Sequence, residues 1–108
     1  MTQAGGPQVL VIDNFHRHDP SEQHVLKGFE TGEQALIYAF RRVRSSVEQF
    51  RDAGQDRDAH YRKWMALGEE CVLDGVRMGQ AWFDWFRRHP ASAAELDYLS
   101  LAPPDPPY

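Results

Sequence analysis

A repeat of apolar residues at helical spacing constrains the fold of this chain more than any other feature. Its members follow one another at steps of four, three, four and three: Leu36, Phe40, Val43, Val47 and Phe50. Such steps place one apolar stripe on a single face of a helix, and another layer of the protein has to cover that stripe. Thr31 and Gln34 fit a capping box in front of the repeat, and Gly54 is typical of a helix C-terminus. We therefore expect a helix of about 20 residues within 31–53, roughly 30 Å long.

Short apolar segments on either side of this helix predict the sheet that covers it. Residues 9–13 are apolar on both faces, which favours a central strand, and residues 24–29 predict a second strand antiparallel to it. The pair Asp74-Gly75 links two further apolar runs, 71–73 and 76–78. A two-residue Asp-Gly link is typical of a hairpin, because both turn positions need a positive φ. The sequence thus predicts a small, largely antiparallel sheet of three or four strands.

The rest of the pattern predicts shorter helices and completes the fold class. We expect one helix at 56–67 and another at 80–89, which halts before Pro90. Ser92 and Glu95 fit a second capping box, which opens a short helix ending near residue 99. The expected fold is α+β: a small sheet packed against one long helix and two or three shorter helices.

Chain length and the composition of the two ends predict the domain organisation. A chain of 108 residues has room for one hydrophobic core, and we assign it to a single α+β domain at 8–101. Residues 1–7 are small and polar, which predicts a flexible leader. Residues 102–108 are proline-rich, which predicts an extended tail.

Charge and cysteine content narrow the classes of function. The 12 basic and 16 acidic residues give a net charge of −4, which argues against broad binding to a phosphate backbone. Cys71 is the single cysteine, so no intramolecular disulfide can form. The aliphatic run at 9–12 is too short for a signal peptide or a membrane span. We expect a cytoplasmic protein that has no cofactor and does not engage a membrane.

Four aromatic residues crowd the helix expected at 80–89: Trp82, Phe83, Trp85 and Phe86. At 100° per residue they cover an arc of about 160°, which is wider than one supporting sheet needs. We expect Trp82 and Phe86 to lie in the core. Phe83 and Trp85 lie at the edges of the arc, and we predict that they form an interface with a partner, where aromatic residues are enriched.

Arginines form a row beside the apolar stripe of the long helix. Arg41, Arg44 and Arg51 share this row with Ile37 and Glu48. We predict that these three arginines contact the partner. Glu48 lies between them at helical spacing, which is typical of a solvated, salt-bridged face. The alternative is a nucleic-acid-binding face, which the acidic net charge makes the less favoured of the two.

Two other clusters offer chemistry but also have simpler interpretations. His16 and His18 form a His-x-His pair that Asp13 or Asp19 could complete as a metal site. Such residues are equally typical of a polar turn, and Arg17 between the histidines opposes a cation. Cys71 could act as a nucleophile, but in an apolar strand a small buried thiol is the common case. Since no catalytic motif is present, we expect no enzyme activity.

Several short motifs resemble a group of small uncharacterised bacterial proteins. The motifs are Asp13-Asn14-Phe15-His16, then Gly28-Phe29-Glu30-Thr31, then Glu33-Gln34-Ala35, with later parts at 64–72 and at Ala81-Trp82. Gln34 stands where that group has Glu, and Glu70-Cys71 interrupts its Gly-Glu-Asp segment near Gly68. The resemblance covers about residues 8–88. It implies a strand–strand–helix–strand–helix fold and no particular activity.

Taken together, these patterns predict a non-enzymatic protein-interaction module, an accessory or inhibitory factor that binds a protein partner or a second copy of itself as a homodimer. Nucleic-acid binding by the arginine row is the first alternative. Metal binding or metal-dependent catalysis at the segment with His16 and His18 is the second.

Overall fold

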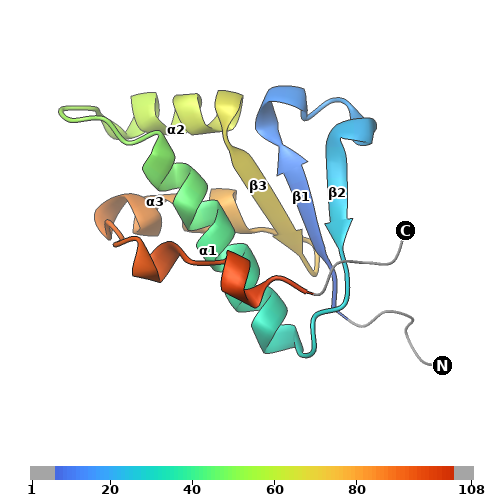
Figure 1. The fold of residues 1–108 in the computed structure, drawn as a ribbon. Helices are drawn as coiled ribbons and strands as arrows, with labels where there is room; N and C mark the ends of the chain where they lie inside the picture. The colour runs from blue at the N-terminus through green and yellow to red at the C-terminus, as the bar shows by residue number, and fades with distance from the viewer. Residues whose placement is uncertain (1–6, 104–108) are drawn as a thin grey trace.

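Four antiparallel strands form one sheet in the order β2-β1-β3-β4 (Figure 1). The structure is a computed structural model that describes residues 7–103. Its strands are β1 (Val9–Asp13), β2 (Gln23–Leu26), β3 (Glu69–Leu73) and β4 (Val76–Arg77). The prediction of a small antiparallel sheet is confirmed, with β1 at its centre between β2 and β3. The predicted leader at 1–7 and tail at 102–108 fall almost wholly outside the described residues.

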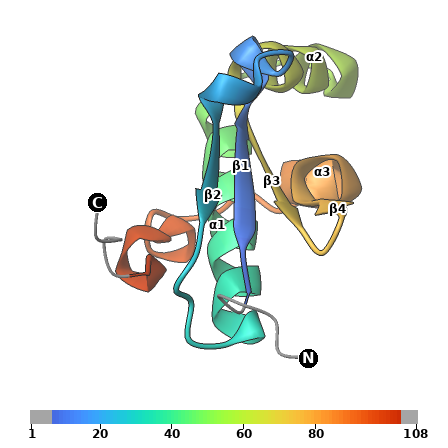
Figure 2. The same ribbon diagram turned by 90° about the vertical axis from the view of Figure 1, so that its right-hand side faces the viewer.

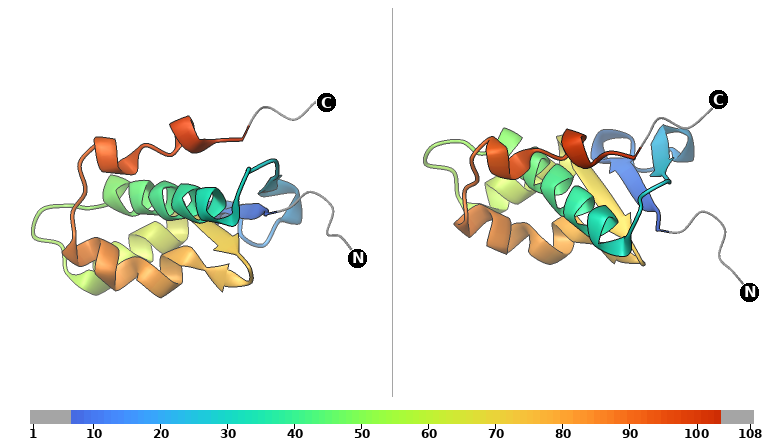
Figure 3. Two further views of the ribbon diagram at one scale, coloured as in Figure 1. Left: turned by 90° about the horizontal axis from the view of Figure 1, so that it is seen from below. Right: turned by 60° about the horizontal axis from the view of Figure 1, so that its bottom comes forward.

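The helices flank this sheet. They are α1 (Gly32–Gln49), α2 (Arg57–Leu67) and α3 (Met78–Arg88), with short 3-10 helices η1 (Asn14–His16), η2 (Pro20–Glu22), η3 (Ala94–Leu96) and η4 (Leu99–Leu101). Seen at 90° to the first view, α1 lies behind the strands, with α3 to one side and the C-terminal segment to the other (Figure 2). The view from below places α1 between that segment and α3 (Figure 3). The predicted α+β class with one long helix on the sheet is confirmed.

The start of α1 follows the predicted capping box. The Gln34 N–H donates to Thr31 Oγ1 at 3.0 Å, and Gln34 Oε1 accepts from the Glu30 N–H at 2.8 Å. Before this cap, β2 ends at Leu26 rather than at residue 29. Gly28 has a φ of +92°, which turns the chain out of the sheet and ends the strand early.

The buried face of α1 is rotated from the predicted stripe. Val43 and Val47 are fully buried as expected, and Phe40 and Phe50 are only partly buried. Leu36 is 46% exposed, so its assignment to the core is wrong. Ala35 and Ala39 are fully buried instead. Small side chains let a helix lie close to its support, and these two alanines turn the helix away from the side that carries Leu36.

A single tryptophan fixes how the later elements pack. Trp64 of α2 is fully buried, and its ring lies against Gly68 and Gly79. A Cβ at either glycine would overlap the ring. The indole N–H of Trp64 donates to the Glu69 carbonyl at 3.2 Å. Glycine is therefore required twice, because the C-cap of α2 and the first turn of α3 each approach the indole through bare backbone.

The predicted hairpin between β3 and β4 is confirmed. Asp74 and Gly75 have φ values of +52° and +79°, and Leu73 pairs with Val76. Helix α3 starts at Met78, two residues before the predicted start. Glu70 is the cause, because its buried carboxylate accepts from the N–H groups of Gly79 and Gln80 and so caps α3 from a neighbouring strand. Burial raises the pKa of Glu70, and these hydrogen bonds oppose that rise.

Candidate functional site

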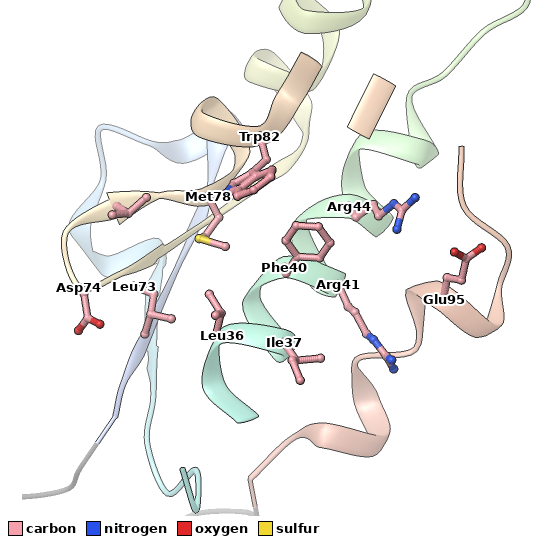
Figure 4. Close-up of a pocket in the computed structure, with 11 residues that line it drawn as sticks. Leu36, Ile37, Phe40, Arg41, Arg44, Leu73, Asp74, Met78, Trp82 and Glu95 are labelled. Carbon is pink, nitrogen blue, oxygen red and sulfur yellow. The ribbon is translucent and has the colours of Figure 1, made fainter. Parts of the chain in front are cut away.

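A groove of about 650 Å³ runs along α1 from Leu36 to Arg44, between that helix, the β3–β4 hairpin and the start of α3. Most of its lining is apolar, and its lining residues are Leu36, Ile37, Phe40, Arg41, Arg44, Leu73, Asp74, Val76, Met78, Trp82 and Glu95. The apolar side chains face a common space (Figure 4). Asp74 lies at one side of that space, whereas the two arginines and Glu95 lie together at the other. The groove therefore combines an apolar floor with a charged side.

Large apolar side chains on the surface concentrate at this groove. Eight are exposed among residues 7–103, and four of them line the groove: Leu36, Ile37, Val76 and Trp82. Trp82 is 41% exposed and Val76 is 47% exposed. The Trp82 ring packs edge-on against Phe40 with the ring centroids 5.7 Å apart. Scattered exposed leucines are ordinary, but a contiguous apolar patch is typical of a binding surface.

The arginine side of the groove is held by the C-terminal segment. Arg41 Nη1 donates to the Asp97 carbonyl at 2.9 Å, and Arg44 Nη2 donates to the His89 carbonyl at 2.6 Å. The Arg44 guanidinium lies 4.9 Å from the centre of the Trp85 ring. Arg44 is only 8% exposed, so the prediction that it lies on a solvated face is wrong. Its planar guanidinium extends from α1 to α3 and stacks on the Trp85 indole, as arginine does readily.

One polar atom of the groove lining lacks a partner. The Nε atom of Arg44 is buried and makes no hydrogen bond, and it is the one such buried side-chain nitrogen or oxygen among residues 7–103. Buried donors are nearly always paired in folded proteins, because an unpaired one has lost its water without replacement. The side of the groove that carries Arg44 therefore has one buried hydrogen-bond donor without an acceptor.

The structure reverses two of the predicted aromatic positions. Phe83, predicted at an interface, is 1% exposed and packs against His60, Tyr61 and Trp64. Trp82, predicted in the core, is on the surface. The reason is that α3 packs against α2 as well as α1, and α2 takes up the Phe83 side of the helix. Phe86 is buried as predicted, and Trp85 is half-buried in a stack with the His89 ring.

Arg51 lies apart from the groove and has a structural role. Its guanidinium forms two hydrogen bonds with Glu48, at 2.9 and 2.8 Å, and donates to the carbonyls of Phe86 and Arg87. It therefore caps the C-terminus of α3. The predicted salt-bridged pair is confirmed for Arg51 and Glu48, and the predicted arginine row is divided between the groove and the end of α3.

Neither of the other two clusters assembles a site. Among residues 7–103, no group of three or more His, Cys, Asp and Glu side chains is arranged to hold a metal ion. His16 Nδ1 lies 3.0 Å from Asp13, and this hydrogen bond raises the pKa of His16 and lowers that of Asp13. Cys71 is fully buried, and burial raises its pKa to about 12. Its thiol therefore stays protonated and inert, as expected of a buried cysteine.

The sequence contains a second signal, beside the helical repeat, that could have predicted the groove. Residues 35–40 read Ala-Leu-Ile-Tyr-Ala-Phe, six consecutive apolar or aromatic residues. Six residues at 100° each go around the whole helix, so one layer cannot cover them all. Some had to face solvent or a partner, and Leu36 and Ile37 do so.

Comparisons with known proteins supply no relative for this chain. No protein-family model matches it, and no match is found among the curated proteins or the solved structures. The resemblance to a group of small bacterial proteins therefore stays a prediction. Within residues 7–103, no helix has both the length and the apolar character needed to cross a bilayer.

Proposed function

We propose that this protein is a non-enzymatic protein-interaction module that receives an amphipathic helical segment of a partner protein in the groove beside α1. One observation carries the proposal: half of the large apolar side chains exposed among residues 7–103 line this single groove. Helices bind such grooves through apolar anchors spaced at three, four and seven residues, with their polar face left in water.

The exposure of the lining favours a polypeptide over a small molecule. Sites for small ligands bury most of the ligand surface. Here Leu36, Val76 and Trp82 are each more than 40% exposed, so a small ligand would stay largely in contact with water. A helix laid along the groove would cover all three side chains and extend beyond them. The gain in buried apolar area then comes from both partners.

The distribution of apolar residues favours a different protein over a second copy. The exposed apolar residues outside the groove are dispersed over separate elements: Phe15 on η1, Val25 on β2, Leu67 on α2 and Leu99 on η4. None of these elements presents an apolar ridge that could fill the groove of another molecule. Two concave surfaces placed together would enclose a void, which forfeits packing contacts. A partner with its own convex apolar helix fits better, and a module of this kind would act as an accessory or inhibitory factor for it.

Selection from a displayed library of random helical peptides tests this proposal. We expect peptides with apolar residues at helical spacing to be enriched on the wild-type protein. Their affinity should fall about tenfold or more for Leu36→Gln and for Trp82→Gln, because these variants remove anchoring contacts. Leu67→Gln and Leu99→Gln are matched controls, since Leu67 and Leu99 are at least as exposed as Leu36 but lie outside the groove. These controls should bind the peptides like the wild type.

Two outcomes would contradict the proposal. Enriched peptides that bind the four variants equally would place their site elsewhere. Sedimentation velocity across a range of concentrations provides the second test. A homodimer that Leu36→Gln dissociates and Leu67→Gln does not would make a second copy the occupant of the groove.

A further inference from the structure

The unpaired donor of Arg44 adds a chemical requirement to the groove. Arg44 is buried, and its Nε–H lacks an acceptor, while the neighbouring Nη2 donates to the His89 carbonyl. The Nε and Nη2 edge of a guanidinium is a fork that matches the two oxygens of a carboxylate. An acceptor delivered to this edge would satisfy a group that the protein leaves unsatisfied. Because Nε is buried, an acceptor reaches it only if the Arg44 side chain moves from its position against the His89 carbonyl and the Trp85 ring.

Arg41 places a second positive charge one helical turn before Arg44. Both side chains line the groove, and Arg41 is half-exposed. A single carboxylate near them would interact with two guanidinium groups at the edge of an apolar surface, where screening by water is reduced.

Glu95 lies on the same side but is held by another residue. Its Oε1 accepts from the Ser92 N–H at 2.9 Å and from the Ser92 hydroxyl at 3.0 Å. These bonds close the second capping box and lower the pKa of Glu95. Its carboxylate offsets part of the positive charge of the arginines without satisfying Arg44 Nε. Asp97 places a second carboxylate near Arg41, yet the Nε–H of Arg44 still lacks an acceptor that an incoming anion could supply.

We infer that the helical segment bound in the groove carries an acidic side chain next to its apolar anchors, and that Arg44 and Arg41 receive this carboxylate. The inference rests on the proposed function, since it describes the occupant of the same groove. The apolar anchors lie over Leu36, Phe40 and Trp82, and the acidic residue lies at the end nearest the C-terminal segment. Asp74, on the far side of the groove, repels an acidic residue placed there and so fixes the direction of the helix.

Three synthetic helical peptides test this inference by titration calorimetry. They share leucine anchors at i, i+4 and i+7 and differ only in flanking residues, which are glutamate, glutamine or lysine. Each peptide is made in two versions, which carry two flanking residues either before the first leucine anchor or after the last. We expect the best glutamate peptide to bind the wild type about tenfold more tightly than its glutamine counterpart, as for hydrogen bonds to a charged group. The lysine peptide should bind most weakly.

Variants of the protein show which residues cause the preference for the glutamate peptide over the glutamine peptide. Arg44→Gln and Arg41→Gln should each reduce the tenfold preference for glutamate to about twofold or less. Arg62→Gln is the matched control. Arg62 is an exposed arginine on α2, so this variant removes the same charge at a position away from the groove. Glu95→Gln should strengthen binding of the glutamate peptide, because a repelling carboxylate is gone. Since Arg44 is buried, thermal unfolding establishes that its variant is folded, and Arg41→Gln provides the test independently.

The outcomes separate this inference from the proposed function. Peptides that bind, depend on Leu36, and show no preference between glutamate and glutamine would overturn the inference and leave the proposed function standing. A preference for lysine would overturn it as well. Failure of every peptide to bind the wild type would remove the proposed function, and the inference with it.

Discussion

Two neighbouring stretches, residues 36–44 of α1 and residues 46–51 at its C-terminal end, meet the rest of the protein in different ways. Around residues 46–51, polar groups are buried and paired: the Ser46 hydroxyl accepts from the Glu69 N–H, and the Val47 carbonyl lies 2.8 Å from His60 Nε2. His60 Nδ1 lies 3.1 Å from Arg87, which also donates to the Gln55 carbonyl. Around residues 36–44, apolar side chains are exposed and Arg44 Nε is unpaired.

The exposed apolar side chains and the unpaired donor therefore gather at residues 36–44, beside the groove. The stretch at 46–51 shows that the chain can satisfy buried polar groups where a tryptophan, a histidine and several arginines pack closely together. An exposed apolar floor and an unpaired donor at residues 36–44 are therefore a local feature, since buried polar groups of the same helix are paired a few residues later. Protein interiors that meet their packing and hydrogen-bonding requirements leave such features mainly at functional sites.

The largest expected effect compares neighbouring aromatic residues of α3. Phe83→Ala should lower the free energy of unfolding by about 3–5 kcal/mol, because it opens a cavity beside Trp64 and His60. Trp82→Ala should cost less, about 1–2 kcal/mol, because Trp82 is 41% exposed and loses mainly its ring contacts with Phe40 and Trp85. Denaturant unfolding monitored by circular dichroism measures both. Equal costs would mean that Trp82 is a core residue and that the groove is not an open surface.

The next effect concerns two glycines in helices. Gly79→Ala should destabilise the protein by about 1–3 kcal/mol, because the new methyl group overlaps the Trp64 ring and approaches the Glu70 carboxylate. Gly32→Ala at the start of α1 should stabilise it by up to about 1 kcal/mol, since nothing lies within 4 Å of the added Cβ. Thermal unfolding of the two variants measures this contrast. A Gly79→Ala variant as stable as the wild type would contradict the close packing of α3 on Trp64.

Lowering the pH tests the hydrogen-bonded region around residues 46–51, because His60 is part of it. Burial is the main cause that lowers the pKa of His60 from its ordinary 6.5, so the unfolded state binds protons first as the pH falls. Stability from this group is complete above about pH 7 and is lost as the pH falls through 6.5 towards the lowered pKa, by at most about 1.4 kcal/mol per pH unit. His60→Gln should remove this slope, because the amide can bond both Val47 and Arg87 without titrating.

Glu70 gives a pH effect of the opposite sign. Burial raises its pKa, so the folded state takes up a proton before the unfolded state does. Stability from Glu70 therefore increases as the pH falls from the raised pKa towards the ordinary 4.5. Comparing Glu70→Gln with His60→Gln across this range separates the two contributions. A wild-type pH profile that neither variant alters would contradict both assignments.

The fold could be predicted from the sequence because its signals are local. The Thr31 capping box, the Asp74-Gly75 turn and the helical spacing of Val43 and Val47 each depend on residues a few positions apart, and the structure confirms all of them. The groove could not be predicted in the same way. Which side of α3 is covered depends on α2, whose position is fixed by Trp64 between Gly68 and Gly79. The start of α3 depends on Glu70, eight residues before Met78.

The smallest expected effect on stability is that of Leu36→Gln, and it gives the sharpest comparison between the two stretches of α1. Leu36→Gln should change the free energy of unfolding by no more than about 0.5 kcal/mol, because a side chain nearly half in water loses little by becoming polar. Val47→Ala, on the same helix but fully buried, should cost about 2 kcal/mol or more. If Leu36→Gln costs as much as Val47→Ala, then the first half of α1 contributes its apolar side chains to folding. If it costs nothing, folding does not require an apolar side chain at Leu36, which is the outcome that the proposed role of Leu36 in the groove predicts.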